Sequence, residues 1–229
     1  MVFFDIDGTL LDHERAERHG AAAFRRRFDD VFGEPLDEFV TLWHATAERH
    51  MDRYIGGELS YEGQRRARMR ELFGRSGRRL TDGEADEAFA VYLDSYREGW
   101  CLFDDVLPCL DALSHLALGI ISNAGAAQQR LKLERTGILD RFDAMAISGE
   151  VGVSKPEPRI FHVACERGGV QPRECVYVGD RLGTDALGAR DAGLRGVWLD
   201  RKGASRGDEG VDVIASLGEL AGLLASRPE

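Results

Sequence analysis

The sequence predicts an α/β fold: a Rossmann-like parallel sheet core with helices on both faces, and an all-helical insertion after the first strand. Three observations predict it. The apolar run VFF at residues 2–4 is typical of a short buried strand. Helical patterning then dominates from Asp12 to about Gly99, and strand-like and helix-like segments alternate after Trp100. The expected domains are a core of residues 1–12 and 100–229 and a helical domain of residues 13–99.

The helical domain is predicted to contain four helices separated by breakers. The breakers are Gly33-Glu34-Pro35, Ile55-Gly56-Gly57 and the stretch 74–83. Ser60 is expected to cap the third helix, and Thr81 or Asp82 the fourth, because short polar side chains satisfy the first backbone N–H groups. The expected helices are His13–Phe32, Leu36–Tyr54, Tyr61–Phe73 and Glu84–Glu98.

The remainder of the core is predicted to alternate strands with helices, which places the strands in parallel. The expected strands are Leu118–Ser122, Ala144–Ser148, Val176–Gly179, Gly196–Leu199 and Val211–Ile214. The expected helices are Val106–Leu116, Ala126–Thr136, Pro158–Arg167, Thr184–Ala192 and Leu217–Ala225.

Composition narrows the functional classes. The 229 residues are 43% hydrophobic, enough for a packed core, but no apolar run approaches the roughly 18 residues of a membrane span. The N-terminus lacks the basic region of a secretory signal. The net charge of −10 argues against general nucleic-acid binding, and an anionic substrate would need local positive groups. The four cysteines form no C-x-x-C pair, so we expect a reducing, cytoplasmic setting.

Polar residues follow four of the predicted strands. The carboxyl ends of parallel strands meet at one edge of a sheet, so these groups should converge if the strands are adjacent. They are Asp5, Asp7, Gly8 and Thr9 after the first strand, Ser122 and Asn123 after the second, the loop Ser154-Lys155-Pro156 after the third, and Asp180 to Asp185 after the fourth.

These residue types suit phosphate chemistry. A cluster of carboxylates, here Asp5, Asp7, Asp180 and Asp185, provides the hard oxygen ligands that Mg²⁺ prefers, and a metal would relieve the repulsion between two aspartates so close together. A carboxylate can also act as a nucleophile and form an aspartyl-phosphate. Each of these short sequence features, taken alone, more often marks an ordinary turn than a functional site. The ordered set, one group after each predicted strand, indicates a site.

The ordered set resembles the haloacid dehalogenase superfamily of hydrolases. "DIDGTL" is similar to the family's first motif, "ISNA" to the second, "GVSKPEPRIF" to the third and "GDRLGTDALGARDAG" to the fourth. The likeness covers roughly residues 1–12 and 100–200, and the helical stretch between them corresponds to the family's C1-type cap. One departure is Arg181, where relatives often carry a small polar residue.

The resemblance implies a role for each matching position. Asp5 would be the nucleophile, and Asp7 the general acid and then base, with its backbone carbonyl on Mg²⁺. Lys155 would balance charge on the nucleophile and the phosphate. Thr9 would hold the Asp7 loop. Ser122 and Asn123 would bind the phosphoryl group. Asp180 and Asp185 would ligate Mg²⁺ or orient its waters.

Asp7 favours phosphate esters within this family. The related dehalogenases carry a non-acidic residue there, because halide leaves without a proton whereas an alkoxide needs one. Sugar-phosphate mutases keep both aspartates and stay an alternative, as does a non-catalytic relative that binds a phosphorylated ligand. The expected partner is a small phosphorylated metabolite, with neither nucleic acid nor membrane involved. The substrate and the oligomeric state are left open.

The helical domain is where substrate choice is expected to lie. Arginine-rich runs at 24–28 and 63–70 are typical of solvated helix faces, although Arg65 or Arg66 could reach a second anionic group on a substrate. Hinges near Leu11-Asp12 and Gly99-Trp100 would let the domain move and exclude water from the phosphoryl intermediate.

Overall fold

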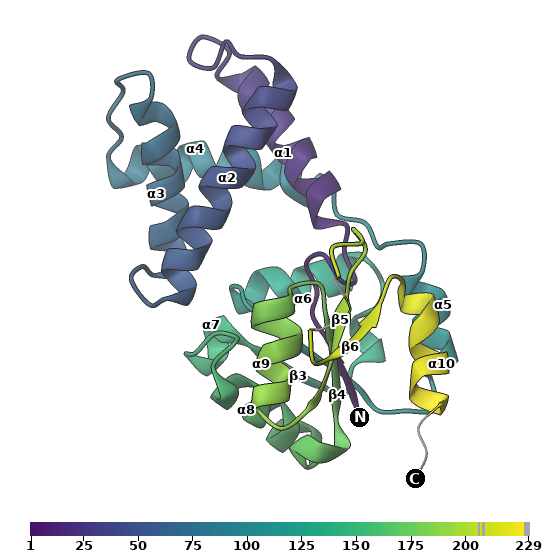
Figure 1. Ribbon diagram of the computed structural model, residues 1–229. Helices are drawn as coiled ribbons and strands as arrows, with labels where there is room; N and C mark the ends of the chain where they lie inside the picture. Colours follow the sequence, from purple (N-terminus) through teal and green to yellow (C-terminus); the bar gives the residue numbers. More distant parts are fainter. Residues whose placement is uncertain (206, 208, 227–229) are drawn as a thin grey trace. The chain divides into compact units, whose positions relative to one another are not determined.

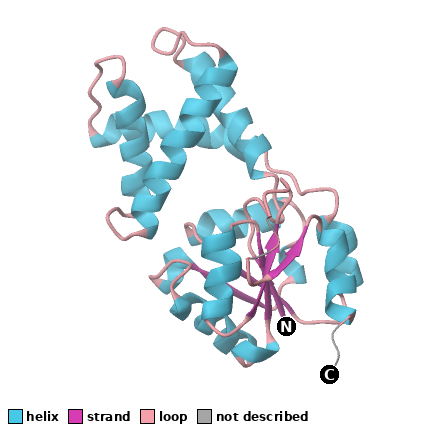
Figure 2. Ribbon diagram, in the orientation of Figure 1, coloured by secondary structure: helices cyan, strands magenta, loops and turns pink. Residues whose placement is uncertain are grey.

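The computed structural model describes residues 1–205, 207 and 209–226 and divides into two compact units. An α/β unit comprises residues 1–12 and 101–229, and a helical unit comprises residues 13–100. Figure 2 shows strands in the α/β unit and helices alone in the helical unit, all of whose residues are described.

The α/β unit is built on a parallel sheet of six strands in the order β3-β2-β1-β4-β5-β6. The first strand is central, with Phe4 level with Ile120 of β2 and with Val178 of β4. These inner strands are apolar and buried, as a sheet covered on both faces requires. The strands are β1 (Val2–Phe4), β2 (Leu118–Ser122), β3 (Ala144–Ile147), β4 (Val176–Gly179), β5 (Arg195–Leu199) and β6 (Asp212–Ile214).

Helices cover both faces of this sheet, so the α/β prediction is confirmed. Figure 1 shows α8 and α9 on one side of the strands and α5 and α10 on the other. Phe161 of α8 packs in one core cluster with Phe3 and Tyr177 of the sheet. The helices are α5 (Val106–Ala112), α6 (Ala126–Arg135), α7 (Ser148–Val151), α8 (Pro158–Gly168), α9 (Gly188–Asp191) and α10 (Leu220–Ala225). Single 3₁₀ turns lie at Leu139–Arg141, Pro172–Glu174 and Leu217–Glu219.

The helical unit consists of α1 (His13–Arg27), α2 (Leu36–Ile55), α3 (Tyr61–Gly74) and α4 (Asp82–Glu98). Its core is mainly aromatic and centres on Phe24, whose ring lies 5.0 Å from that of Trp43. The predicted caps are confirmed: the Ser60 hydroxyl accepts the Gly63 N–H, and Thr81 forms a reciprocal capping box with Glu84.

Some predicted boundaries were wrong. The first helix ends at Arg27 rather than Phe32, and Asp29 and Asp30 follow where the helix dipole disfavours negative charge. The helix from Val106 ends at Ala112, because tight turns lead the chain into β2. Ser148 begins α7 instead of ending β3. No helix in the described ranges combines the length and the apolar character that crossing a bilayer would require.

Candidate active site

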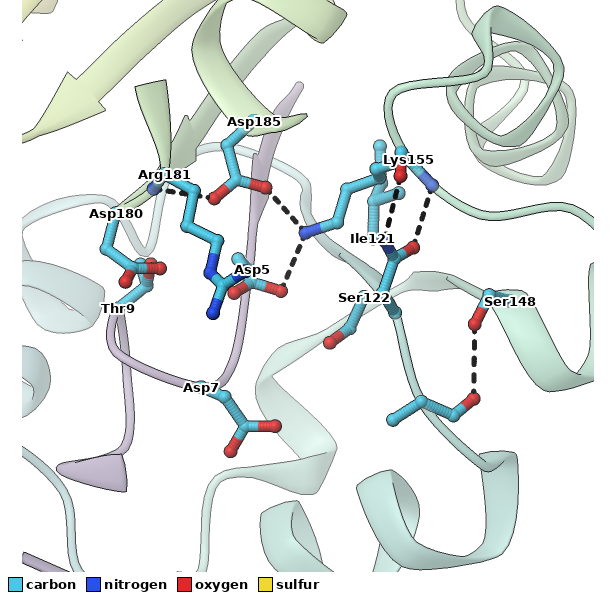
Figure 3. A network of polar contacts seen from close by, with 12 residues as sticks. Asp5, Asp7, Thr9, Ile121, Ser122, Ser148, Lys155, Asp180, Arg181 and Asp185 are labelled. Carbon is cyan, nitrogen blue, oxygen red and sulfur yellow. Dashed lines mark hydrogen bonds and ion pairs between the residues drawn. The ribbon is translucent and has the colours of Figure 1, made fainter. Parts of the chain in front are cut away.

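The centre of the site is a buried ammonium between two carboxylates. Lys155 Nζ lies 2.9 Å from Asp5 Oδ1 and 2.7 Å from Asp185 Oδ1, and all three side chains are buried (Figure 3). Asp5 directly follows β1, where its N–H donates to the Val178 carbonyl and so extends the β1–β4 ladder by one residue. The two central strands therefore fix where the Asp5 carboxylate emerges.

Asp180 completes a cluster of carboxylates at the end of β4. One oxygen each of Asp5, Asp180 and Asp185 lies within 4.8 Å of the others. The Thr9 hydroxyl donates to Asp180 Oδ1 at 3.4 Å. Gly8 adopts φ +86°, and a side chain at this position would collide with the Asp180 carboxylate. The glycine of the first motif thus allows the loop after β1 to approach the end of β4.

The next turn holds Asp185 against the same cluster. Leu182–Leu187 forms a π-helical turn, and Asp185 Oδ2 accepts the Arg181 N–H at 2.9 Å. Gly179 has no room for a side chain, since a Cβ there would touch Asp185. The sequence predicted one helix over Thr184–Ala192; the wider turn replaces its first half and brings Asp185 back to Lys155.

The cluster carries more negative than positive charge. Three carboxylates face the buried ammonium of Lys155 and the guanidinium of Arg181, whose charge acts on Asp180. Desolvation raises the pKa of Asp180 to about 8, and the charges of Asp185 and Asp5 add to the rise. Burial also raises the pKa of Asp5, against the pull of Lys155. Burial alone would lower the pKa of Lys155, but Asp185 and Asp5 raise it. An additional cation would bring this group of charges into balance.

Ser122 and Asn123 stand at the end of β2, next to β1. Asn123 Nδ2 donates to the Lys155 carbonyl at 2.9 Å, and the Lys155 N–H donates to Asn123 Oδ1 at 2.7 Å. The Asn123 amide therefore ties the Lys155 loop to β2. Ser122 is buried, and its Oγ accepts a hydrogen bond from Gln129 Nε2 at 2.8 Å.

Asp7 is set apart from the other site aspartates. Its carboxylate is not part of the cluster that Asp5 forms with Asp180 and Asp185, and it points away from them in Figure 3. It lies against helix α6, where Lys132 Nζ is 2.5 Å from Oδ1 and Gln129 Nε2 donates to Oδ2 at 2.9 Å. The structure thus separates the two aspartates of the first motif into different charge environments.

Sequence reasoning missed three residues of this site. Gln129 and Lys132 bind Asp7, and the Tyr177 hydroxyl contacts Lys155 Nζ at 2.7 Å. Lys132 is one of only three lysines, and its i, i+3 spacing from Gln129 in the helix after β2 was an available signal. Nothing in the pattern distinguishes Tyr177 from its apolar neighbours in β4.

Comparison with known proteins places this arrangement in a family. The model of the haloacid dehalogenase-like hydrolase family matches residues 1–193. The chain belongs to this family. Glyceraldehyde 3-phosphate phosphatase of Methanopyrus kandleri is 45% identical over 212 residues, which cover 87% of this chain and 83% of that protein. Pyrimidine 5'-nucleotidase YjjG of Escherichia coli is 31% identical over 239 residues, which cover 99% of this chain and 98% of that protein.

A solved structure supports the fold. The HAD-hydrolase YfnB from Bacillus subtilis superposes with a TM-score of 0.82 and covers 97% of both chains at 21% identity. The predicted family and enzyme class are therefore confirmed: this chain is a haloacid dehalogenase-like hydrolase, and the two relatives described above are named for the hydrolysis of phosphate esters. Such relatives are consistent with hydrolysis of phosphate monoesters.

Proposed function

We propose that this chain is a Mg²⁺-dependent phosphatase that hydrolyses a small phosphate monoester through an aspartyl-phosphate intermediate on Asp5. The observation that carries the proposal is the convergence of Asp5, Asp180 and Asp185 around the buried Lys155, at the end of the parallel sheet. Their surplus negative charge fits a divalent cation, and oxygen ligands of this kind suit Mg²⁺. Bound there, Mg²⁺ would offset the charge of the carboxylates and of the phosphoryl oxygens.

The first half of the reaction transfers the phosphoryl group to the protein. An Asp5 carboxylate oxygen attacks phosphorus, the bond from phosphorus to the ester oxygen breaks, and Asp7 gives its proton to the departing oxygen. Lys155 and the Ser122 hydroxyl would stabilise the negative charge that spreads over the phosphoryl oxygens. In this proposal Asn123 contributes by holding the Lys155 loop as well as by facing the phosphate.

The second half restores Asp5. Asp7, now a carboxylate, takes a proton from water as the water oxygen bonds to phosphorus, and the bond from phosphorus to Asp5 breaks. Inorganic phosphate leaves, and Asp7 holds the proton for the next cycle. Thr9 supports both steps by its contact with Asp180.

We further propose that the substrate is a phosphorylated metabolite and that the helical unit selects it, as the C1-type cap does in the family. The names of two relatives suggest glyceraldehyde 3-phosphate and pyrimidine nucleotides as the first compounds to test in a substrate panel. Arg66 contributes little to selection in this proposal, because it pairs with Asp82 and Asp86 of its own unit. A cytoplasmic location accords with the four free cysteines.

The test is phosphate release by purified protein from an aryl phosphate and from this panel. Turnover should require Mg²⁺, stop on chelation and disappear in Asp5→Asn, while the exposed Asp140→Asn in the same unit should behave as wild type. No turnover by folded, Mg²⁺-loaded protein would leave only a binding role. Isomerisation of a sugar phosphate without phosphate release would establish a mutase, and halide release from a haloacid would contradict the role given to Asp7.

A further inference from the structure

The side chains of helix α6 bind the Asp7 carboxylate from one side. Lys132 Nζ lies 2.5 Å from Oδ1 and 2.6 Å from Oδ2, and Gln129 Nε2 lies 2.9 Å from Oδ2. The two residues are three apart and so share a face of the helix. All the groups involved lie within the α/β unit, so the contacts belong to one compact body.

Burial makes these contacts costly to break. Lys132 is 1% exposed and Gln129 is 0% exposed. A buried ammonium needs a close counter-charge, and the Asp7 carboxylate supplies one. The Asp7 side chain itself is 24% exposed, so it is held from the buried side while its other side stays accessible to solvent.

Gln129 also connects Asp7 to the predicted phosphate-binding residue Ser122. Its Nε2 donates to Asp7 Oδ2 at 2.9 Å and to Ser122 Oγ at 2.8 Å. Its Oε1 is buried and has no hydrogen-bond partner within the described part of the chain. The amide keeps this orientation although it orphans an acceptor, because the reverse orientation would turn Oε1 toward the carboxylate. The bonds to Asp7 and Ser122 therefore decide where the amide points.

We propose that Lys132 and Gln129 are positioning residues for the proton transfers of Asp7. They hold the Asp7 carboxylate in one direction, away from the aspartates that would bind the metal. Gln129 also hydrogen-bonds to the Ser122 hydroxyl, which is expected to bind the phosphate. The inference rests on the proposed phosphatase function. Proton transfer needs a heavy-atom approach of roughly 2.6–3.2 Å, and a misplacement of about 1 Å can cost about 10²-fold in rate.

The test exploits the leaving group. An aryl phosphate with a weakly basic phenolate leaves without a proton, whereas an alkyl phosphate such as glycerol 3-phosphate requires one. Lys132→Met should lower kcat/KM for the alkyl phosphate about tenfold or more and leave that for the aryl phosphate within about threefold. Lys132→Arg should restore part of the loss. Arg130→Met, on the same helix but paired with Glu150, should change neither value.

A double-mutant cycle separates positioning from a general effect on structure. In the Asp7→Asn background, Lys132→Met should cause no further change in the ratio of alkyl to aryl kcat/KM, because the group it positions is already gone. Gln129→Leu should also lower kcat/KM selectively for the alkyl phosphate, by a smaller factor. If Lys132→Met does not fold, the same double-mutant cycle is measured with Gln129→Leu. Equal loss on both substrates, or a further selective loss without Asp7, would overturn the proposal.

The same measurements keep this inference distinct from the proposed function. If wild-type protein hydrolyses neither phosphate with Mg²⁺ present, the phosphatase function fails and the inference falls with it. If the wild type hydrolyses both and Lys132→Met retains the wild-type ratio, the function stands and the positioning role is wrong.

Discussion

Asp5 in the α/β unit and Glu17 in the helical unit are 6% and 4% exposed, yet their pKa values shift in opposite directions. Burial raises the pKa of Asp5, and Lys155 does not compensate fully because Asp185 and Asp7 add negative charge. Burial would also raise the pKa of Glu17, but the His44 hydrogen bond and the charges of His13 and Arg68 bring it below its ordinary value.

The difference lies in the balance of charge around each carboxylate. Glu17 accepts from His44 at 2.7 Å and lies 3.8 Å from Arg68, so one acid meets two bases. Around Lys155 three acids meet two bases, Lys155 itself and Arg181. A buried acid with enough bases beside it serves the structure of its helices, whereas a cluster with surplus acids needs an external cation. The comparison thus distinguishes buried charges that serve function from buried charges that serve structure.

The largest expected effect is that of Asp5→Asn. Without the nucleophile, turnover should fall at least about 10³-fold. The free energy of unfolding in chelator should not decrease, because the substitution removes one of the surplus carboxylates and leaves Lys155 paired with Asp185. Phosphate release and urea denaturation measure the two effects. A clear loss of stability would mean that Asp5 belongs to a balanced structural pair, as Glu17 does.

Lys155→Met should be the most destabilising change at the site. It leaves buried carboxylates without their cation, and breaking such a group costs about 3–5 kcal/mol in the free energy of unfolding. Urea denaturation in chelator checks the value, with Arg130→Met as the control because its pair with Glu150 is partly exposed. An unchanged stability would contradict the account of Lys155 as the buried counter-charge of Asp5 and Asp185.

Adding Mg²⁺ should stabilise the α/β unit. At a concentration about 100-fold above its Kd the ion adds about 2.7 kcal/mol to the free energy of unfolding. Asp180→Asn should remove most of this gain, and Glu17→Gln should leave it intact, since Glu17 belongs to the other unit. Thermal unfolding with and without Mg²⁺ provides the test, and an equal gain in both variants would refute a site at Asp180.

Glu17→Gln should lower the free energy of unfolding by about 2 kcal/mol, because it removes the buried negative charge that faces both His44 and Arg68. Hydrogen exchange in peptides of α1 and α2 would locate the loss. Glu14→Gln, in the exposed first turn of α1, is the matched control. A variant as stable as wild type would show that this carboxylate is not held by its neighbours.

The smallest expected effects are those of pH on the two histidines of α2. The hydrogen bond to Glu17 raises the pKa of His44 above 6.5, so its contribution to stability is present below pH 6.5 and is lost as pH rises through the folded pKa. Burial lowers the pKa of His50 despite Glu71, so its contribution is present above pH 6.5 and is lost as pH falls through the folded pKa.

Stability of the helical unit should therefore decline on both sides of pH 6.5, by about half a kcal/mol or less per histidine, since solvent screens His44. His44→Gln should remove the decline on the alkaline side and His50→Gln that on the acid side. Thermal unfolding from pH 5 to 8 measures both slopes. The same slope in both variants would contradict the opposite environments assigned to these histidines.

Much of this architecture follows from local signals in the sequence. Short apolar runs predicted the strands because the inner strands of a doubly covered sheet are buried, and the order of polar residues after them predicted the shared edge. Ser60 and Thr81 predicted helix starts because a cap depends only on neighbouring residues. The turn at Leu182–Leu187 was not predictable, because Asp185 is held there by Lys155, which lies 30 residues away in the sequence.

The sequence contains only part of the information needed to find the partners of Asp7, for a related reason. Spacing shows that Gln129 and Lys132 share a face of α6, but it does not show which strand end that face meets. Asn123 illustrates the converse: its residue type suits a phosphate ligand, and only the structure reveals that its amide holds the main chain of Lys155. The type of a residue indicates which interactions its side chain can make, whereas packing decides which partner it contacts.

The central claim is that the cluster of Asp5, Asp180 and Asp185 serves the transfer of a phosphoryl group to Asp5. The most direct test quenches the protein with acid during turnover of an aryl phosphate with Mg²⁺ and then analyses its peptides by mass spectrometry. The account predicts one phosphoryl group on the peptide that contains Asp5, absent without Mg²⁺ and absent in Asp5→Asn. Hydrolysis at the wild-type rate in Asp5→Asn, or a phosphoryl group on another residue, would contradict it.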